Sequence, residues 1–335
     1  MEFDAISTIL LIVFFGLIFD FTNGFHDAAN VVSTVIATRV LIPLKAILMA
    51  AILNFIGATL ISGVAETITK GLVKLESATQ ITVLCALIGA ITWNLITWYY
   101  AIPSSSSYAL VGGLIGASWM HAGVEIILWK GIVYKVVLPM VCSPIVGFCI
   151  AFFFLKRLNK WINKERKHKN DKLFARLQIV SAALVAFAHG LNDAQKSMGI
   201  ITLGLFAGGH LLYPQIPVWV IFSCALMMAL GTLFGGKKII RTVGFEITPL
   251  QPLQGFVAET SVACVILVAS FFGMPISSTH MIVGSVTGVG AANGVREVRW
   301  EIGKKLGLAW VLTLPGSAFV SAVIYWLILY SSKMV

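Results

Sequence analysis

The chain has 335 residues, of which 58% are hydrophobic and only 11% are charged, and its net charge is +10. Soluble domains carry about 25% charged residues, so this composition excludes an ordinary soluble domain and indicates a chain that resides in lipid. The positive charge does not indicate a nucleic-acid-binding protein, because it is concentrated in short segments between apolar stretches.

Apolar stretches near the length that crosses a bilayer recur along the chain. We expect membrane helices in residues 5–19, 46–65, 81–101, 136–155, 216–234, 256–274 and 306–330. No cleavage site of small residues follows the first stretch, so we expect it to be retained as a membrane helix. The five cysteines lie in apolar stretches without metal-binding spacing, and we expect them to be small buried hydrophobic residues.

Two related polar motifs interrupt apolar stretches in the two halves of the chain. They read NGFHDAAN at residues 23–30 and HGLNDAQK at residues 189–196, and 166 residues separate Asp27 from Asp193. A glycine stands at the start of each motif, and we expect the membrane helix to break there. Broken apolar segments at matching positions of two halves are typical of the binding site of a transporter.

A second pair of motifs lies further along each half. These read IPSSSSY at residues 102–108 and MPISSTH at residues 274–280, and 172 residues separate Pro103 from Pro275. Because both pairs recur in the same order with nearly the same offset, the sequence indicates a duplicated unit.

We divide the chain into a first transmembrane repeat (1–155), a basic loop (156–176) and a second transmembrane repeat (177–335). Basic loops between membrane helices stay in the cytoplasm, so we expect this loop inside and the N-terminus, which lacks basic residues, outside. The first half then crosses an odd number of times, which inverts the second copy. The predicted fold is an all-α polytopic membrane protein of two inverted-topology repeats, with broken helices and two re-entrant helical hairpins.

The acidic residues of the first motif pair predict a cation site. An ionised carboxylate in hydrocarbon is costly, and its recurrence as Asp27 and Asp193 favours function over local capping. Amide and carbonyl oxygens beside these carboxylates suit a small hard cation such as sodium. Glu259 is a further candidate, although its position is equally compatible with the membrane interface. The predicted sodium ligands are Asn23, Asp27, Asn30, Asn192, Asp193, Gln195 and Glu259.

The role of Lys196 stays open at this stage, because it is the one lysine or arginine in the motifs. It could neutralise Asp193, contact an anion, or extend to the membrane interface.

The proline–serine motifs predict an anion site. Proline is favoured at the start of a helix, serine or threonine caps its first turn, and the free N–H groups there bind anions. Glycine-rich apolar runs follow both motifs, so we expect re-entrant hairpins rather than surface loops. Two such turns facing each other could surround a tetrahedral oxyanion. The predicted anion ligands are Ser105, Ser106, Ser107, Ser277, Ser278 and Thr279.

The four motifs together resemble those of the inorganic phosphate transporter family, the Pit permeases, most clearly over residues 20–120 and 180–290. The resemblance implies a secondary transporter of the cell membrane that is cation-coupled and homodimeric, with phosphate and sodium held by the paired motifs. We therefore expect a sodium–phosphate symporter that is not an enzyme and needs no cofactor, sodium being its coupling ion. The first motif has His26 where the second has Asn192, so this position need not serve equally in both halves.

Two alternatives remain open. The first is a relative that couples to protons or carries sulfate. The second is a membrane-embedded enzyme that uses aspartate-bound metal on a phosphorylated lipid. The second is disfavoured, because such enzymes need clustered acidic pairs and each motif has a single aspartate.

Overall fold

The computed structural model describes residues 5–60, 63–162 and 167–333, and this part of the chain is helical without a named β-strand. This confirms the predicted all-α class. The helices of the first half are α1 (Ala5–Ala37), α2 (Pro43–Thr59), α3 (Gly63–Lys70), η1 (Leu75–Ser77), α4 (Gln80–Tyr99), α5 (Ser106–Ala122), η2 (Val124–Ile126), α6 (Trp129–Ile132), η3 (Val133–Val137) and α7 (Leu138–Trp161).

The second half repeats this order of long and short helices. Its helices are α8 (Lys167–Ala207), α9 (Val218–Phe234), α10 (Lys237–Arg241), η5 (Thr242–Glu246), α11 (Pro252–Phe271), α12 (Ser278–Asn293), η6 (Val295–Glu297) and α13 (Trp300–Lys333). In this order α1 corresponds to α8, α2 to α9, α4 to α11, α5 to α12, and α7 to α13.

Six helices in the described residues are long and apolar enough to cross a membrane. They are Ile6–Ala37, Gln80–Tyr99, Trp129–Trp161, Asp171–Ala207, Pro252–Phe271 and Trp300–Ser331. Two bent pairs raise the number to eight if each is one span: α2 bends by 67° into α3, and α9 bends by 68° into the segment Lys238–Glu246. These bends are at corresponding positions of the two halves.

Both aspartate motifs lie inside continuous helices, so the predicted break at each motif is wrong. α1 runs unbroken through residues 23–30, and α8 runs unbroken through residues 189–196. The broken helices of this fold are the bent pairs instead.

The motif glycines allow close packing of neighbouring helices. A Cβ atom on Gly24 would lie 2.5 Å from the Met228 carbonyl oxygen of α9, and one on Gly190 would lie 2.1 Å from the Asn54 carbonyl oxygen of α2. Small residues permit such backbone approach between membrane helices. Each motif glycine therefore joins its helix to a helix of the other half.

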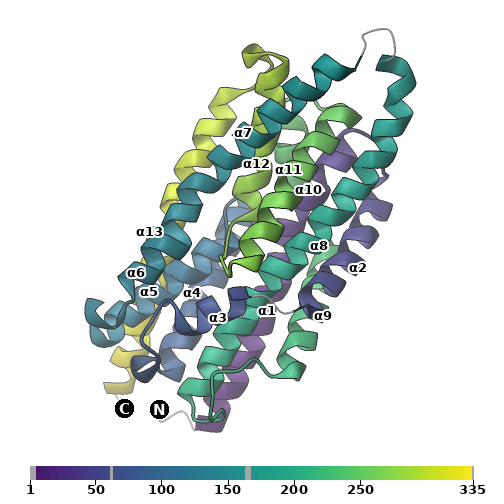
Figure 1. Ribbon diagram of the computed structural model, residues 1–335. Helices are drawn as coiled ribbons and strands as arrows, with labels where there is room; N and C mark the ends of the chain where they lie inside the picture. Colours follow the sequence, from purple (N-terminus) through teal and green to yellow (C-terminus); the bar gives the residue numbers. More distant parts are fainter. Residues whose placement is uncertain (1–4, 61–62, 163–166, 334–335) are drawn as a thin grey trace.

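The helices α1 and α8 run antiparallel through the centre of the molecule (Figure 1). Midway along α1, Ser197 of α8 donates a hydrogen bond of 2.8 Å to Asp20. Just after the end of α1, Thr38 donates one of 2.9 Å to Gln178. The first long helices of the two halves thus point in opposite directions.

Each half also packs its last long helix against the hairpin of the other half. The hairpin of α4 and α5 packs on α13, and α12 of the second hairpin packs on α7. Both hairpins return to the side from which they started, and their turns lie inside the helical bundle (Figure 1). Each hairpin is surrounded by its own cluster of buried apolar side chains.

Two details differ from the sequence predictions. The basic segment 156–176 is helical at both ends, since α7 continues to Trp161 and α8 begins at Lys167, and residues 163–166 lie outside the described residues. The expectation that all cysteines are buried is also wrong, because Cys142 and Cys264 are exposed. Both lie on helices that can cross a membrane, so their exposed side chains suit lipid contact.

Candidate functional site

The turns of the two hairpins have matching backbone geometry. Ala101 and Gly273 both have a positive φ, of 56° and 65°, and they stand 172 residues apart, as the two prolines do. Ser105 then caps α5 by accepting a hydrogen bond from the Tyr108 N–H, and Ser277 caps α12 by accepting one from the His280 N–H. The predicted serine caps are confirmed, and both helix N-termini are buried.

Asp27 of α1 contacts both hairpins. Ser106 of the first hairpin donates a hydrogen bond of 2.8 Å to its Oδ2, and Thr279 of the second donates one of 3.1 Å to its Oδ1. The neighbouring His26 Nδ1 lies 2.8 Å from Oδ1. The side chain of Asp27 is only 2% exposed, so these groups replace water around the carboxylate.

Asp193 of α8 has a different set of partners. Ser278 donates to its Oδ2 over 3.2 Å, and the Lys196 ammonium lies 2.5 Å from its Oδ1. His189 Nε2 lies 3.1 Å from Oδ2. Asp193 therefore has a lysine partner from its own motif, whereas the partners of Asp27 are hydroxyl groups and an imidazole.

The two aspartate motifs converge on one centre. Oxygen and nitrogen ligand atoms of Asp27, His189 and Asp193 all lie within 4.8 Å of one another, and all three residues are buried. Residues 166 positions apart in sequence thus share a site, with the N-termini of both hairpin helices beside it. Such a site can hold a cation on the carboxylates and an anion at the helix N-termini.

Two predicted ligands of the second motif make bonds elsewhere in the protein. Asn192 donates to the Ser270 hydroxyl over 2.8 Å and to the Met274 carbonyl over 3.2 Å, which holds the second hairpin against α8. Gln195 donates to the Leu60 carbonyl over 2.8 Å, at the end of α2.

Each aspartate motif leaves one buried amide oxygen without a hydrogen-bond partner in the described residues, Asn23 Oδ1 in the first and Asn192 Oδ1 in the second. Asn23 is 1% exposed. An orphaned buried oxygen is costly, so it suits a cation ligand. The side chain of Asn30 lies outside the described residues.

Glu259 belongs to a separate polar cluster. Its Oε1 accepts hydrogen bonds from Thr34 (2.6 Å) and Gln178 (3.1 Å), and its Oε2 accepts one of 2.5 Å from Ser181. Thr34 is two helical turns from Asp27 along α1, roughly 10 Å. The structure thus brings together Asp27 and Asp193 but joins Glu259 to other partners.

Sequence reasoning missed Asp20, which is fully buried and accepts a hydrogen bond from Ser197. The signal was present in its spacing. Polar residues at alternating intervals of three and four positions share one face of a continuous helix. This pattern holds for Asp20, Asn23, Asp27, Asn30 and Thr34. The predicted break in the helix hid this pattern, because residues on either side of a break do not share one helix face.

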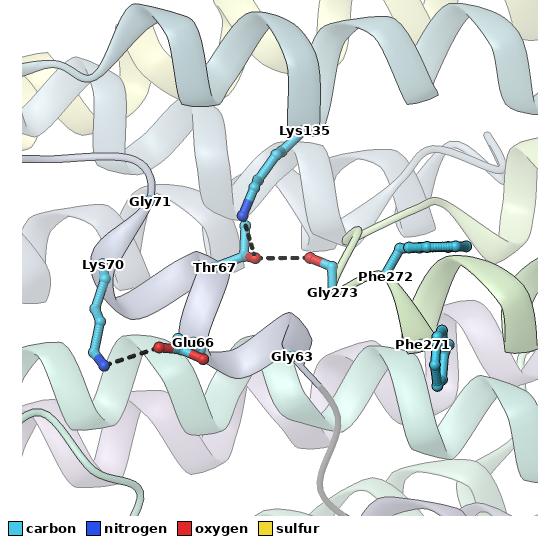
Figure 2. A pocket seen from close by; sticks show the side chains of 9 residues that line it. All are labelled: Gly63, Glu66, Thr67, Lys70, Gly71, Lys135, Phe271, Phe272 and Gly273. Carbon is cyan, nitrogen blue, oxygen red and sulfur yellow. Dashed lines mark hydrogen bonds and ion pairs between the residues drawn. The ribbon is translucent and has the colours of Figure 1, made fainter.

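A cavity of about 560 Å³ lies beside the turn of the second hairpin (Figure 2). Thr67 of α3 donates to the Gly273 carbonyl over 2.7 Å, and the Lys135 ammonium donates to the Thr67 hydroxyl over 3.1 Å. Figure 2 shows Lys70 and Glu66, paired at 2.9 Å, further along the same short helix. The cavity thus has two lysines and one carboxylate.

A cavity of about 530 Å³ lies at the corresponding place beside the first hairpin turn. It is lined by turn residues 100–103 and by Lys238, Arg241 and Lys305, against the single carboxylate of Glu246. Each hairpin turn therefore adjoins a cavity with more basic than acidic side chains. We call these two cavities the vestibules.

A helical membrane fold that directs the buried N-termini of two hairpin helices and two carboxylates at one centre defines a polytopic membrane transporter. The model of the phosphate transporter family matches residues 23–321, and the chain belongs to this family. It is a family of transporters and not of enzymes, as the sequence predicted.

Known proteins resemble the chain over nearly its whole length. It is 44% identical over 332 residues to a probable low-affinity inorganic phosphate transporter of Bacillus subtilis, covering 98% of this chain and 99% of that protein. It is 45% identical over 313 residues to a protein of the same description from Rhizobium meliloti, covering 92% and 93%. A solved structure described as the sodium-dependent phosphate transporter matches with a TM-score of 0.86 and 28% identity, covering 96% of this chain and 99% of that chain.

Proposed function

We propose that the chain imports inorganic phosphate by symport with sodium ions, with alternating access around the centre formed by Asp27 and Asp193. The observation that carries this proposal is the position of Asp27 between Ser106 of one hairpin and Thr279 of the other. Because Asp27 accepts hydrogen bonds from both hairpins, a cation that binds to its carboxylate would change the hydrogen bonding of both anion-binding turns. The relatives named for phosphate and for sodium dependence support the same pair of solutes.

Phosphate would bind between the two hairpin N-termini. The hydroxyls of Ser106, Ser278 and Thr279 donate to aspartate oxygens, and rotation about χ1 would redirect each toward a phosphate oxygen. Free N–H groups of the first turns, held by the capping serines Ser105 and Ser277, would supply further donors. Ser107 is the remaining predicted phosphate ligand.

Sodium would bind carboxylate oxygen that the hydroxyls release. Phosphate brought close to Asp27 and Asp193 meets negative charge, and arginine, the usual bidentate phosphate partner, is absent from both motifs. A bound cation offsets this repulsion. The membrane potential also favours symport, because moving one elementary charge across 100 mV changes the free energy by about 2.3 kcal/mol. Entry of a divalent phosphate alone would be opposed by an inside-negative potential, at twice the energy per elementary charge.

The two vestibules would be the routes to and from the centre. Basic side chains at their walls would raise the local concentration of phosphate. The antiparallel directions of α1 and α8 support inverted repeats, which would place the vestibules on opposite sides of the membrane. An N-terminus outside, a cytoplasmic segment 156–176, the repeat boundaries at 155 and 177, and a homodimer remain predictions from the sequence.

Phosphate binding to purified protein at several sodium concentrations, at fixed ionic strength and pH, tests the proposal. We expect sodium to tighten phosphate binding and phosphate to tighten sodium binding by the same factor. Asp27→Asn should weaken both, because it keeps the shape and removes the charge. Asp171→Asn, on an exposed site of α8, is the matched control and should behave as the wild type. Affinity that follows pH and ignores sodium would select proton coupling, and stronger competition by sulfate than by phosphate would reject phosphate as the substrate.

A further inference from the structure

The second aspartate motif contains a buried lysine where the first has an amide. The 166-residue offset that relates Asp27 to Asp193 also relates Asn30 to Lys196. Lys196 is 1% exposed and lies within α8, in the last third of that helix. A charged side chain at such depth requires partners, and its position in one copy only makes the two halves unequal.

The ammonium of Lys196 is surrounded by oxygen atoms from three separate elements. It contacts Asp193 Oδ1 of α8 at 2.5 Å and the Ile276 carbonyl of the second hairpin turn at 2.8 Å. It also donates to the hydroxyl of Ser107, on the first hairpin. A carboxylate, a backbone carbonyl and a hydroxyl are the ligand types that a hard metal cation takes in proteins. The lysine thus reaches both hairpins and α8 with a single positive charge.

We propose that the Lys196 ammonium takes the place of a coupling cation at the second motif, so that sodium binds only at the first motif, around Asp27. This inference rests on the proposed sodium coupling and deepens it. Asp193 is neutralised by the chain itself, whereas the partners of Asp27 are Ser106, Thr279 and His26. The amide nitrogens of Asn192 and Gln195, both predicted as sodium ligands, are bonded to the second hairpin and to the end of α2. The Asn192 Oδ1 has no hydrogen-bond partner among the described residues. The second motif, with Asp193 paired to Lys196, therefore adds no net negative charge beside the anion.

The energetic consequence is a smaller coupling number. The Lys196 ammonium is part of the chain and does not have to bind from solution. The charge of Asp193 is therefore balanced at any sodium concentration. A symmetric chain, with an amide at position 196, would need one more cation from solution to assemble the same centre. The number of sodium ions bound with each phosphate should therefore depend on this one side chain.

The test compares Lys196→Asn, which restores the symmetry of the two motifs, with Lys196→Met, which removes the charge and offers no oxygen. Phosphate affinity of the purified proteins is measured against sodium concentration at fixed ionic strength. For Lys196→Asn we expect weak binding at low sodium, recovery at high sodium, and a log–log slope steeper than that of the wild type by about one. Lys196→Met should bind weakly at every sodium concentration. Lys172→Asn, an exposed lysine of the same helix, is the control.

Other outcomes would reject the inference. Equal weakening of Lys196→Asn at all sodium concentrations would make Lys196 a direct phosphate ligand rather than a substitute cation. If Lys196→Asn does not fold, Asp27→Asn provides the second test, because the inference leaves no other sodium site. Residual sodium dependence in Asp27→Asn would overturn it. Wild-type binding that ignores sodium would contradict the proposed symport, and a sodium dependence gained by Lys196→Asn would still support the role of Lys196.

Discussion

The ring of Tyr108 packs against the imidazole of His280, with their centroids 5.2 Å apart. Each residue follows the last predicted anion ligand of its motif, and 172 residues separate them, so corresponding positions of the two hairpins are in contact, with the rings tilted by 42°. His280 also packs on Trp310 of α13, at 4.1 Å between centroids, and the Trp310 Nε1 donates to the Pro103 carbonyl. This stack joins the first turn of α12 to both the first hairpin and α13.

Loss of the Tyr108 ring should lower the stability of the contact between the two hairpins. Tyr108→Phe keeps the ring contact and should retain stability and phosphate uptake. Tyr108→Ala leaves a cavity, and large-to-small changes at buried aromatic positions cost about 3–5 kcal/mol. Thermal unfolding in detergent and uptake into sealed vesicles would measure both effects. Equal stability of the two variants would show that the stack does not hold the hairpins together.

Substitution of the serines that bond to the aspartates should weaken phosphate binding. Ser106→Ala and Ser278→Ala each remove one hydroxyl donor, and a hydrogen bond to a charged group is worth about 1.5–3 kcal/mol, or roughly one to two decades in affinity. Ser331→Ala, at an exposed site near the end of α13, is the control. Titration of purified protein with phosphate gives the affinities. Wild-type affinity in both variants would rule out this assignment of the hairpins.

The capping serines have a different role and should give a different result. Ser105→Ala and Ser277→Ala remove the N-caps of α5 and α12, and such a loss costs about 1 kcal/mol of stability. Phosphate affinity should fall together with melting temperature, since the free N–H groups of these turns lose their orientation. Thermal unfolding with and without phosphate separates the two quantities. A weakened affinity without any change in melting temperature would make these serines direct ligands only.

An added methyl group at a motif glycine should destabilise the fold. Gly24→Ala and Gly190→Ala would place Cβ atoms 2.5 Å and 2.1 Å from backbone carbonyl oxygens of neighbouring helices. Overpacking of this kind costs about 1–3 kcal/mol. Gly307→Ala is the matched control, because no atom lies within 4 Å of its added Cβ. Thermal unfolding should rank the control above both motif variants, and a reversed order would mean that these glycines serve another purpose.

The vestibules offer a test of inverted topology. Cysteines introduced as Lys70→Cys and Lys238→Cys, in a background without the five natural cysteines, place one label in each vestibule. A membrane-impermeant thiol reagent should modify the two sites from opposite sides of sealed vesicles. Modification of both from the same side in every condition would exclude inverted repeats.

The sequence by itself determined the membrane class, the internal duplication and the two aspartates, Asp27 and Asp193, that meet at the centre. Hydrophobic composition and the recurrence of motifs at fixed offsets are properties of the chain that need no knowledge of neighbours. The same is true of the caps formed by Ser105 and Ser277, because a cap depends on a hydroxyl within three residues of the N–H that it accepts from.

Only the tertiary structure decided whether α1 and α8 break. A glycine can interrupt a helix or let another helix approach, and the choice depends on the backbone that packs against it, which for Gly24 belongs to α9. The partners of Lys196 and Glu259 were undetermined for the same reason, since they come from elements distant in sequence. Local pattern fixes which residues are polar at membrane depth, and long-range packing fixes which of them share a site.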